Sequence, residues 1–198
     1  MKSIKKVNED KLSEMFNTAY NLSFNRTRPV YNKAFRLWLE AAEAGHIRSQ
    51  FYVAWCFDIG KGTEKNIEKA YSWYLKAAKS GHMESQFNVG FFYRQGEVVE
   101  QNFRKMVYWY KLAAKAGDTW AQLDLGVAYI EGNGVRKNFQ TAVSWYRKAA
   151  QKNEVKALFN LGLCFQDGTG VKASERWAKY YFEKAASFGH KKAKKKLV

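Results

Sequence analysis

Three histidines of this 198-residue chain recur at a fixed interval and invite reading as metal ligands or catalytic bases. His82 lies 36 residues after His46, and His190 lies three such intervals after His82. Side chains spaced by whole repeats project in parallel from successive layers, so they cannot converge on one ion at about 2 Å. Each histidine follows a glycine that ends a helix, and we interpret it as the polar residue that begins the next helix.

Other catalytic patterns are missing from the sequence. It contains no C-x-x-C, H-E-x-x-H, G-x-S-x-G or G-x-x-x-x-G-K-[ST] motif, and its carboxylates are scattered singly. The glycine pairs recur with the same 36-residue interval, which indicates turns rather than a phosphate cradle; they are Gly60/Gly62, Gly132/Gly134 and Gly168/Gly170. We therefore expect no enzyme activity, no cofactor and no metal site.

The two cysteines occupy one position of the repeat, three repeats apart. With helices packed about 8 to 10 Å apart and two helices per repeat, Cys56 and Cys164 would be separated by roughly 30 Å. A disulfide needs Cα atoms within about 7 Å, so we expect two free, buried thiols in a reducing compartment. Residues 1–11 lack the apolar core of a signal peptide, and no apolar run approaches the ~20 residues of a membrane span. These features predict a cytoplasmic protein.

The sequence repeats without insertions from Trp38 to Ala193, and this repeat predicts the secondary-structure elements that position these residues. Tyr74 aligns with Tyr110 and Tyr146 at 36-residue intervals, and alanine pairs and glycines recur in the same register. A fixed period of this length is typical of a solenoid, in which each unit buries its apolar face on its neighbours. We predict an all-α solenoid of antiparallel helix pairs, with a first helix such as 85–95 and a second helix such as 103–116.

Both ends of the second helix are marked in the repeat. Short polar residues stand before it, where a side-chain acceptor contributes about 1 kcal/mol by capping free N–H groups; they are Asn66, Asn102, Asn138 and Ser174. The residues that follow it tolerate a positive φ; they are Gly81, Gly117, Asn153 and Gly189. The sequence therefore predicts where each second helix begins and ends.

The terminal units depart from the pattern. Apolar residues at helical spacing predict a helix over about 9–22. We expect one solenoid domain over 1–198, with 1–30 as a degenerate N-terminal capping unit, 31–192 as repeats and 193–198 as a truncated, Lys-rich C-terminal cap. The lysines of that tail favour a solubilising cap, with an electrostatic binding tail as the alternative.

Residues 121–150, which read AQLDLGVAYIEGNGVRKNFQTAVSWYRKAA, resemble the Sel-one-like repeat, a relative of the tetratricopeptide repeat. The resemblance covers residues 31–192. It implies a right-handed superhelix whose first helices line a concave surface, and a role as an adaptor or scaffold or, in some members, as an immunity protein against a toxin. Val98 departs from the pattern because it stands where Gly62, Gly134 and Gly170 do, so we expect its loop to bend differently.

The tetratricopeptide-like arrangement places the third and seventh residues of each first helix in the concave groove. These partner-binding candidates are Phe51, Trp55, Phe87, Phe91, Leu123, Val127, Phe159 and Leu163, with Arg94 at a polar border. An apolar groove of this length is typical of an interaction site for a helix or an extended segment. The alternative is that many of these side chains pack between neighbouring first helices. The groove interpretation is favoured over this alternative for Trp55 and Phe91.

The charge is strongly positive, with 34 basic and 18 acidic residues and a net charge of +16. With first helices taken as 49–60, 85–96, 121–132 and 157–168, Arg94 is their only basic residue. The excess therefore falls on second helices, loops and termini, and includes an electrostatic edge of Lys105, Lys111, Lys115, Arg147 and Lys148. Such bands indicate either a solvated outer face or a surface for an acidic partner or polyanion.

Together these features favour a non-enzymatic adaptor or scaffold that binds a protein or peptide, expected to be acidic, in an aromatic concave groove. An immunity protein against a cognate toxin is one alternative. Nucleic-acid or polyanion binding through the basic convex surface is the other. Against it, we expect aromatic and basic residues on different faces, whereas single-strand binders interleave them.

Overall fold

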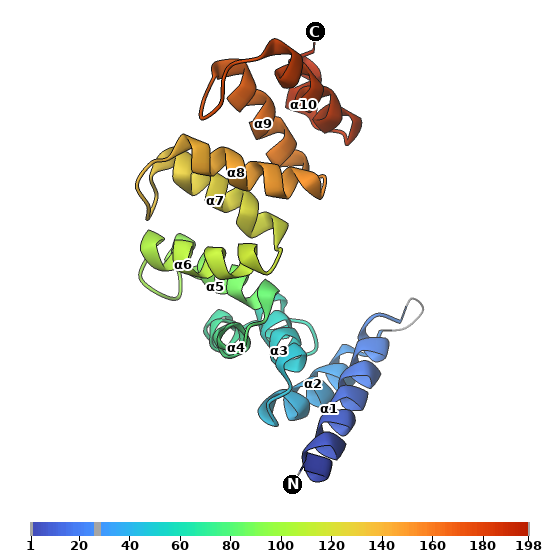
Figure 1. The fold of residues 1–198 in the computed structure, drawn as a ribbon. Helices are drawn as coiled ribbons and strands as arrows, with labels where there is room; N and C mark the ends of the chain where they lie inside the picture. Colours follow the sequence, from blue (N-terminus) through green and yellow to red (C-terminus); the bar gives the residue numbers. More distant parts are fainter. Residues whose placement is uncertain (1, 26–28, 198) are drawn as a thin grey trace. The chain divides into compact units, whose positions relative to one another are not determined.

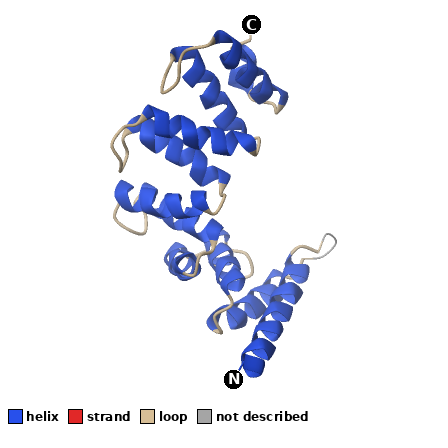
Figure 2. Ribbon diagram, viewed as in Figure 1, coloured by secondary structure: helices blue, strands red, loops and turns tan. Residues whose placement is uncertain are grey.

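The structure, a computed structural model, describes residues 2–25 and 29–197, and its account of side chains begins at residue 8. Over these residues it contains helices and no strands (Figures 1 and 2). In chain order the helices are α1 (Lys2–Ser23), α2 (Tyr31–Glu43), α3 (Ile47–Ile59), α4 (Ile67–Lys79), α5 (Met83–Gln95), α6 (Phe103–Lys115), α7 (Thr119–Glu131), α8 (Phe139–Gln151), α9 (Val155–Asp167), α10 (Glu175–Ser187) and α11 (Lys191–Lys195).

The chain forms two compact units, which are described separately. The N-terminal unit comprises residues 1–92 and 96–100, and the C-terminal unit comprises 93–95 and 101–198. In the N-terminal unit α1 packs on α2, α2 on α3, and α3 on α4. In the C-terminal unit each helix from α6 to α11 packs on the next one in sequence. The prediction of an all-α solenoid of consecutive helix pairs is therefore confirmed.

The second helices begin and end where the repeat predicts. The Asn66 side chain accepts a hydrogen bond from the Lys69 amide at 2.8 Å, and the other predicted caps, Asn102, Asn138 and Ser174, act in the same way. At the other end, Gly81, Gly117 and Gly189 have φ values of 91°, 102° and 87°. Asn153, with φ of 59°, is the only non-glycine residue with positive φ in the described part of the chain.

A glycine on the first helix meets an aromatic ring on the second helix of the same repeat. A Cβ atom at Gly126 on α7 would overlap the ring of Tyr146 on α8, and Gly162 and Phe182 repeat this relationship between α9 and α10. Both rings are almost fully buried. The missing side chain therefore lets each helix pair pack closely around one large ring.

Both cysteines are buried and free. Burial raises the pKa of the Cys56 thiol to about 12 and that of Cys164 to about 11. Such thiols carry little thiolate near neutral pH and are poor nucleophiles. Their prediction as small buried apolar residues is confirmed.

The backbone conformation at Val98 differs from that of its glycine counterparts. Gly62, Gly134 and Gly170 all have positive φ and approach the backbone carbonyl of an earlier second helix so closely that a Cβ would overlap it. Val98 carries a Cβ and does not share this conformation. The loop nevertheless closes as its counterparts do, because the Asn102 amide donates to the Tyr93 carbonyl at 2.8 Å, as the Asn66 amide does to the Phe57 carbonyl.

The first helices begin two residues earlier than expected. Because His46 caps α3, that helix starts at Ile47 rather than 49, and α9 starts at Val155 because Glu154 caps it. Arg48 and Lys156 therefore lie on first helices, so the assignment of Arg94 as their only basic residue is wrong. At the ends of the chain, α1 extends beyond the expected 9–22, and α11 begins at Lys191 rather than Ala193.

Candidate binding surfaces

The three histidines are helix caps. Nδ1 of His82 accepts a hydrogen bond from the Ser85 amide at 3.3 Å, and His46 does the same for Ser49. His190 accepts from the Ala193 amide at 3.1 Å. This confirms the interpretation of these residues as helix starts, and within the described residues no three His, Cys, Asp or Glu side chains gather as a metal site.

Burial lowers the pKa of all three imidazoles below the usual 6.5. Arg48 lowers the pKa of His46 and His82 further, whereas Glu84, 3.6 Å from His82, acts in the opposite direction. A neutral ring is required for the cap, because only an unprotonated Nδ1 can accept the amide hydrogen bond. The environment therefore supports the capping role.

Two of the predicted groove residues stack on these caps. The Phe51 ring lies 4.8 Å from the imidazole of His82, and the Phe159 ring lies 4.4 Å from that of His190, both in stacked geometry. Both phenylalanines are half-buried. Phe51 and Phe159 therefore pack partly between helices, as the alternative to the groove interpretation predicts, although each keeps an exposed part.

Leu123, at the same repeat position, does not line a groove. Its side chain is 4% exposed and belongs to the hydrophobic core of the C-terminal unit. A smaller aliphatic side chain lies deeper between the helices than a phenylalanine at this position. Its placement among the partner-binding residues is wrong.

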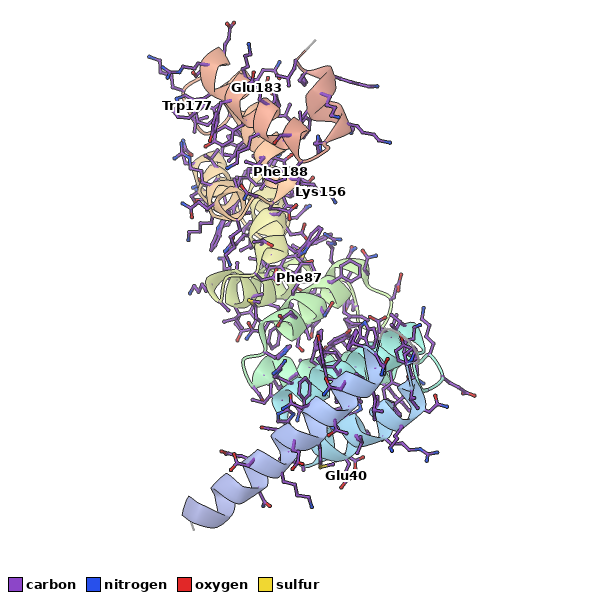
Figure 3. All side chains as sticks on the ribbon, turned by 90° about the vertical axis from the view of Figure 1, so that its right-hand side faces the viewer. Glu40, Phe87, Lys156, Trp177, Glu183 and Phe188 are labelled. Carbon is purple, nitrogen blue, oxygen red and sulfur yellow. The ribbon has the colours of Figure 1, made fainter. Side chains whose placement is uncertain are left out.

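The remaining predicted groove residues are half-buried in both units. In the N-terminal unit the Trp55 ring lies 6.1 Å from Phe24 and 6.2 Å from Tyr52, while Phe87 and Phe91 lie on α5 (Figure 3 labels Phe87). In the C-terminal unit Val127 and Leu163 pack against the core. The larger, partly exposed apolar side chains among the predicted groove residues are thus concentrated in the N-terminal unit.

Arg94 forms an ion pair beside Val127. Its Nη1 atom lies 2.8 Å from Oδ2 of Asp124, and the Tyr110 hydroxyl also favours the charged form of that carboxylate. These side chains line a cavity of about 90 Å³ that includes Glu131. Burial raises the pKa of Asp124 above its usual 3.8, and Arg94 and the hydroxyl oppose that rise.

The positive charge is uneven along the chain. Residues 1–100 contain 15 basic and 11 acidic residues, whereas residues 101–198 contain 19 basic and 7 acidic residues. No acidic residue lies on α6 or α8. The predicted edge residues Lys105, Lys115, Arg147 and Lys148 are exposed on these helices, and Lys111 is half-buried.

Basic and aromatic side chains are interleaved on the second helices. Lys76 Nζ lies 3.8 Å from the Trp73 ring centre, and Lys148 Nζ lies 4.2 Å from that of Trp145. These i, i+3 pairs lie on one side of each helix, and their spacing is visible in the sequence. The expectation that basic and aromatic residues lie on different faces, and with it the argument against nucleic-acid binding, is wrong.

Comparison with known protein families identifies the family of this chain. The Sel1 repeat matches residues 15–46, 47–82, 84–118, 121–154 and 155–190. The chain belongs to the Sel1 repeat family. Sel1 repeat proteins generally act as non-catalytic scaffolds for protein interactions. The first matched repeat starts within α1, so the family pattern reaches further toward the N-terminus than residue 31.

Two solved Sel1 repeat structures are similar over nearly the whole chain. A Sel1 repeat protein from Oxalobacter formigenes is 28% identical with a TM-score of 0.86, over 94% of this chain and 76% of that one. A protective antigen of uropathogenic Escherichia coli, c5321, is 27% identical with a TM-score of 0.90. That match covers 98% of this chain but 42% of the antigen, so the chain spans less than half of its length.

More distant matches support the Sel1 repeat fold alone. The immunity protein Pa5087 from Pseudomonas aeruginosa is 19% identical with a TM-score of 0.56, over 92% of this chain and 68% of that one. A search of curated proteins found no match. Within the described residues, no helix is both long and apolar enough to cross a membrane.

Proposed function

We propose that this Sel1 repeat chain is a non-enzymatic adaptor that binds a protein or peptide segment on the first helices of its N-terminal unit. One observation carries the proposal: four large aromatic side chains at the predicted groove positions stay partly exposed there. They are Phe51, Trp55, Phe87 and Phe91. Aromatic side chains supply much of the binding energy of protein interfaces, because each removes a large apolar area from water.

The proposed partner is acidic. A net charge of +16 accelerates association with a negatively charged protein, and this effect weakens as salt screens the attraction. The basic edge formed by Lys105, Lys111, Lys115, Arg147 and Lys148 contributes to that attraction. An immunity role, in which the acidic partner is a toxin, is a special case of this proposal and is supported only by similarity of fold.

Site-specific photo-crosslinking tests the proposal without truncating a half-buried ring. A photoreactive phenylalanine analogue is placed at Phe91 in one variant and at Tyr108, which is 58% exposed on α6, in a matched control. Both proteins are irradiated in nuclease-treated lysate at low and moderate salt. We expect one discrete crosslinked protein at Phe91 and not at Tyr108. Crosslinking of that protein at Tyr108 alone would contradict binding on the first helices.

A further inference from the structure

The C-terminal unit contains an open hollow of about 580 Å³ between the end of α7 and the beginning of α8. It is lined by Tyr129, Val135, Arg136, Lys137, Asn138 and Thr141. Two of these residues are cations and none is acidic. Lys111 adds a third positive charge, since its Nζ atom lies 5.7 Å from the centre of the Tyr129 ring.

Thr141, which lines the hollow, stands where the other repeats have a long side chain. At the same position in other repeats, Lys69 lies 5.4 Å from the ring of Phe57, Lys105 lies 5.2 Å from Tyr93, and the ring of Trp177 lies 6.1 Å from that of Phe165. Thr141 is too short to extend over Tyr129 in this way. This repeat therefore lacks the side chain at position 141 that lies near the ring in the other three, and Lys111 of α6 is the cation beside Tyr129.

The loop before α8 is also unusually basic. Arg136 and Lys137 stand where the other repeats have Glu64-Lys65, Glu100-Gln101 and Lys172-Ala173. The nearby carboxylate of Glu131 accepts a hydrogen bond of 2.6 Å from Asn133 and does not line the hollow. The shorter side chain of Thr141 and the second cation of the Arg136-Lys137 pair thus occur at the same hollow.

The two helices that pack against α7 carry further positive charge. Arg104, Lys105, Lys111 and Lys115 lie on α6, and Arg147 and Lys148 lie on α8, with no acidic residue on either helix. Tyr108, also on α6, is 58% exposed. A surface of this extent suits a chain of negative charges better than a single anion.

We propose that this face of the C-terminal unit binds single-stranded nucleic acid, with one base entering the hollow against Tyr129. Lys111, Arg136 and Lys137 contact the flanking phosphates, and the cations of α6 extend the contact. An aromatic ring combined with a basic track suits an unstacked strand, because a duplex keeps its base faces inside the stack. An acidic peptide would match the charge but would leave the space beside the ring unused. This function is separate from the protein binding assigned to the N-terminal unit.

Fluorescence anisotropy with fluorescein-labelled dT12 and rU12 tests the proposal on the full chain at 50 and 200 mM salt. R136E/K137Q, which copies the Glu100-Gln101 pair, should weaken binding about tenfold or more at low salt. The matched control K33E/R36Q removes the same charge from exposed positions of α2 and should change affinity less than about twofold.

Thr141→Lys distinguishes binding in the hollow from non-specific electrostatic attraction. It adds a cation, yet it should weaken binding at least about fivefold, because the new side chain would cover the ring as Lys69 and Lys105 do. If circular dichroism shows that this variant does not fold, Thr141→Gln provides the same test. Tighter binding by T141K, or equal losses in R136E/K137Q and K33E/R36Q, would overturn the proposal. Polyglutamate or a duplex that competes as well as dT12 would overturn it too.

Discussion

Arg94 holds a guanidinium nitrogen 2.8 Å from a carboxylate oxygen of Asp124. The carboxylate is partly buried, and burial raises its pKa, while Arg94 and the Tyr110 hydroxyl favour the charged form. The sequence marks Arg94 as the polar border of a groove, but it gives no sign of a partner 30 residues away. The ion pair depends on the packing of neighbouring repeats.

Replacing Arg94 with methionine should raise the pKa of Asp124 further, because the opposing positive charge is lost. A carboxyl group whose pKa is higher in the folded state binds more protons when folded, so acidification favours folding at that site. The stability deficit of Arg94→Met should therefore shrink as the pH falls from 7 to 4. Carbon-13 NMR titration and chemical denaturation measure the two effects, with Arg94→Lys as the charge-preserving control. An unchanged pKa of Asp124 would contradict the assigned pairing.

The histidine caps should make the protein less stable in mild acid. The pKa of His82 is lowered in the folded state, so below about pH 6.5 the unfolded chain binds protons that the folded chain does not. The free energy of unfolding should fall from pH 7 to pH 5. His82→Asn keeps a capping acceptor that does not titrate, and we expect stability similar to wild type at pH 7.5 with a shallower decline below it. Identical slopes for the two proteins would show that His82 does not contribute.

Gly126 should not tolerate a side chain. A Cβ at this position would overlap the ring of Tyr146, so Gly126→Ala should reduce the free energy of unfolding by about 1–3 kcal/mol despite the higher helix propensity of alanine. Urea denaturation of a double-mutant cycle with Tyr146→Leu tests the cause. The smaller leucine should relieve the overlap, so the alanine substitution should cost less in that background. Strict additivity of the two substitutions would exclude this contact as the cause.

The sequence predicted the repeat, the helix pairs and the caps because these depend on local residue types at a fixed period. Asn66 and Gly81, for example, act on backbone groups within one turn of the helix. Side-chain exposure on the first helices depends instead on how residues of different size fill the space between neighbouring helices. For that reason the sequence places Leu123 in a groove although it is buried, while Phe51 at the equivalent position stays partly exposed.

The hollow beside Tyr129 illustrates a signal that was present in the sequence but needed the structure for its meaning. Thr141 aligns with Lys69, Lys105 and Trp177 in the repeat, so the difference in length is visible in the letters alone. That these side chains extend over a ring at the end of the first helix follows only from their positions in space. Repeat proteins thus supply an internal comparison that becomes informative once the contacts are known.

Leu123 and Leu163 provide a direct test of which first-helix residues form the core. Leu123 is 4% exposed within the core cluster, so Leu123→Ala should reduce the free energy of unfolding by about 2–5 kcal/mol. Leu163 is half-buried, and the same substitution there should cost clearly less, because part of the lost side chain already contacts water. Urea denaturation monitored by circular dichroism measures both. A larger loss at Leu163 than at Leu123 would contradict this arrangement of the first helices and restore Leu123 as a surface residue.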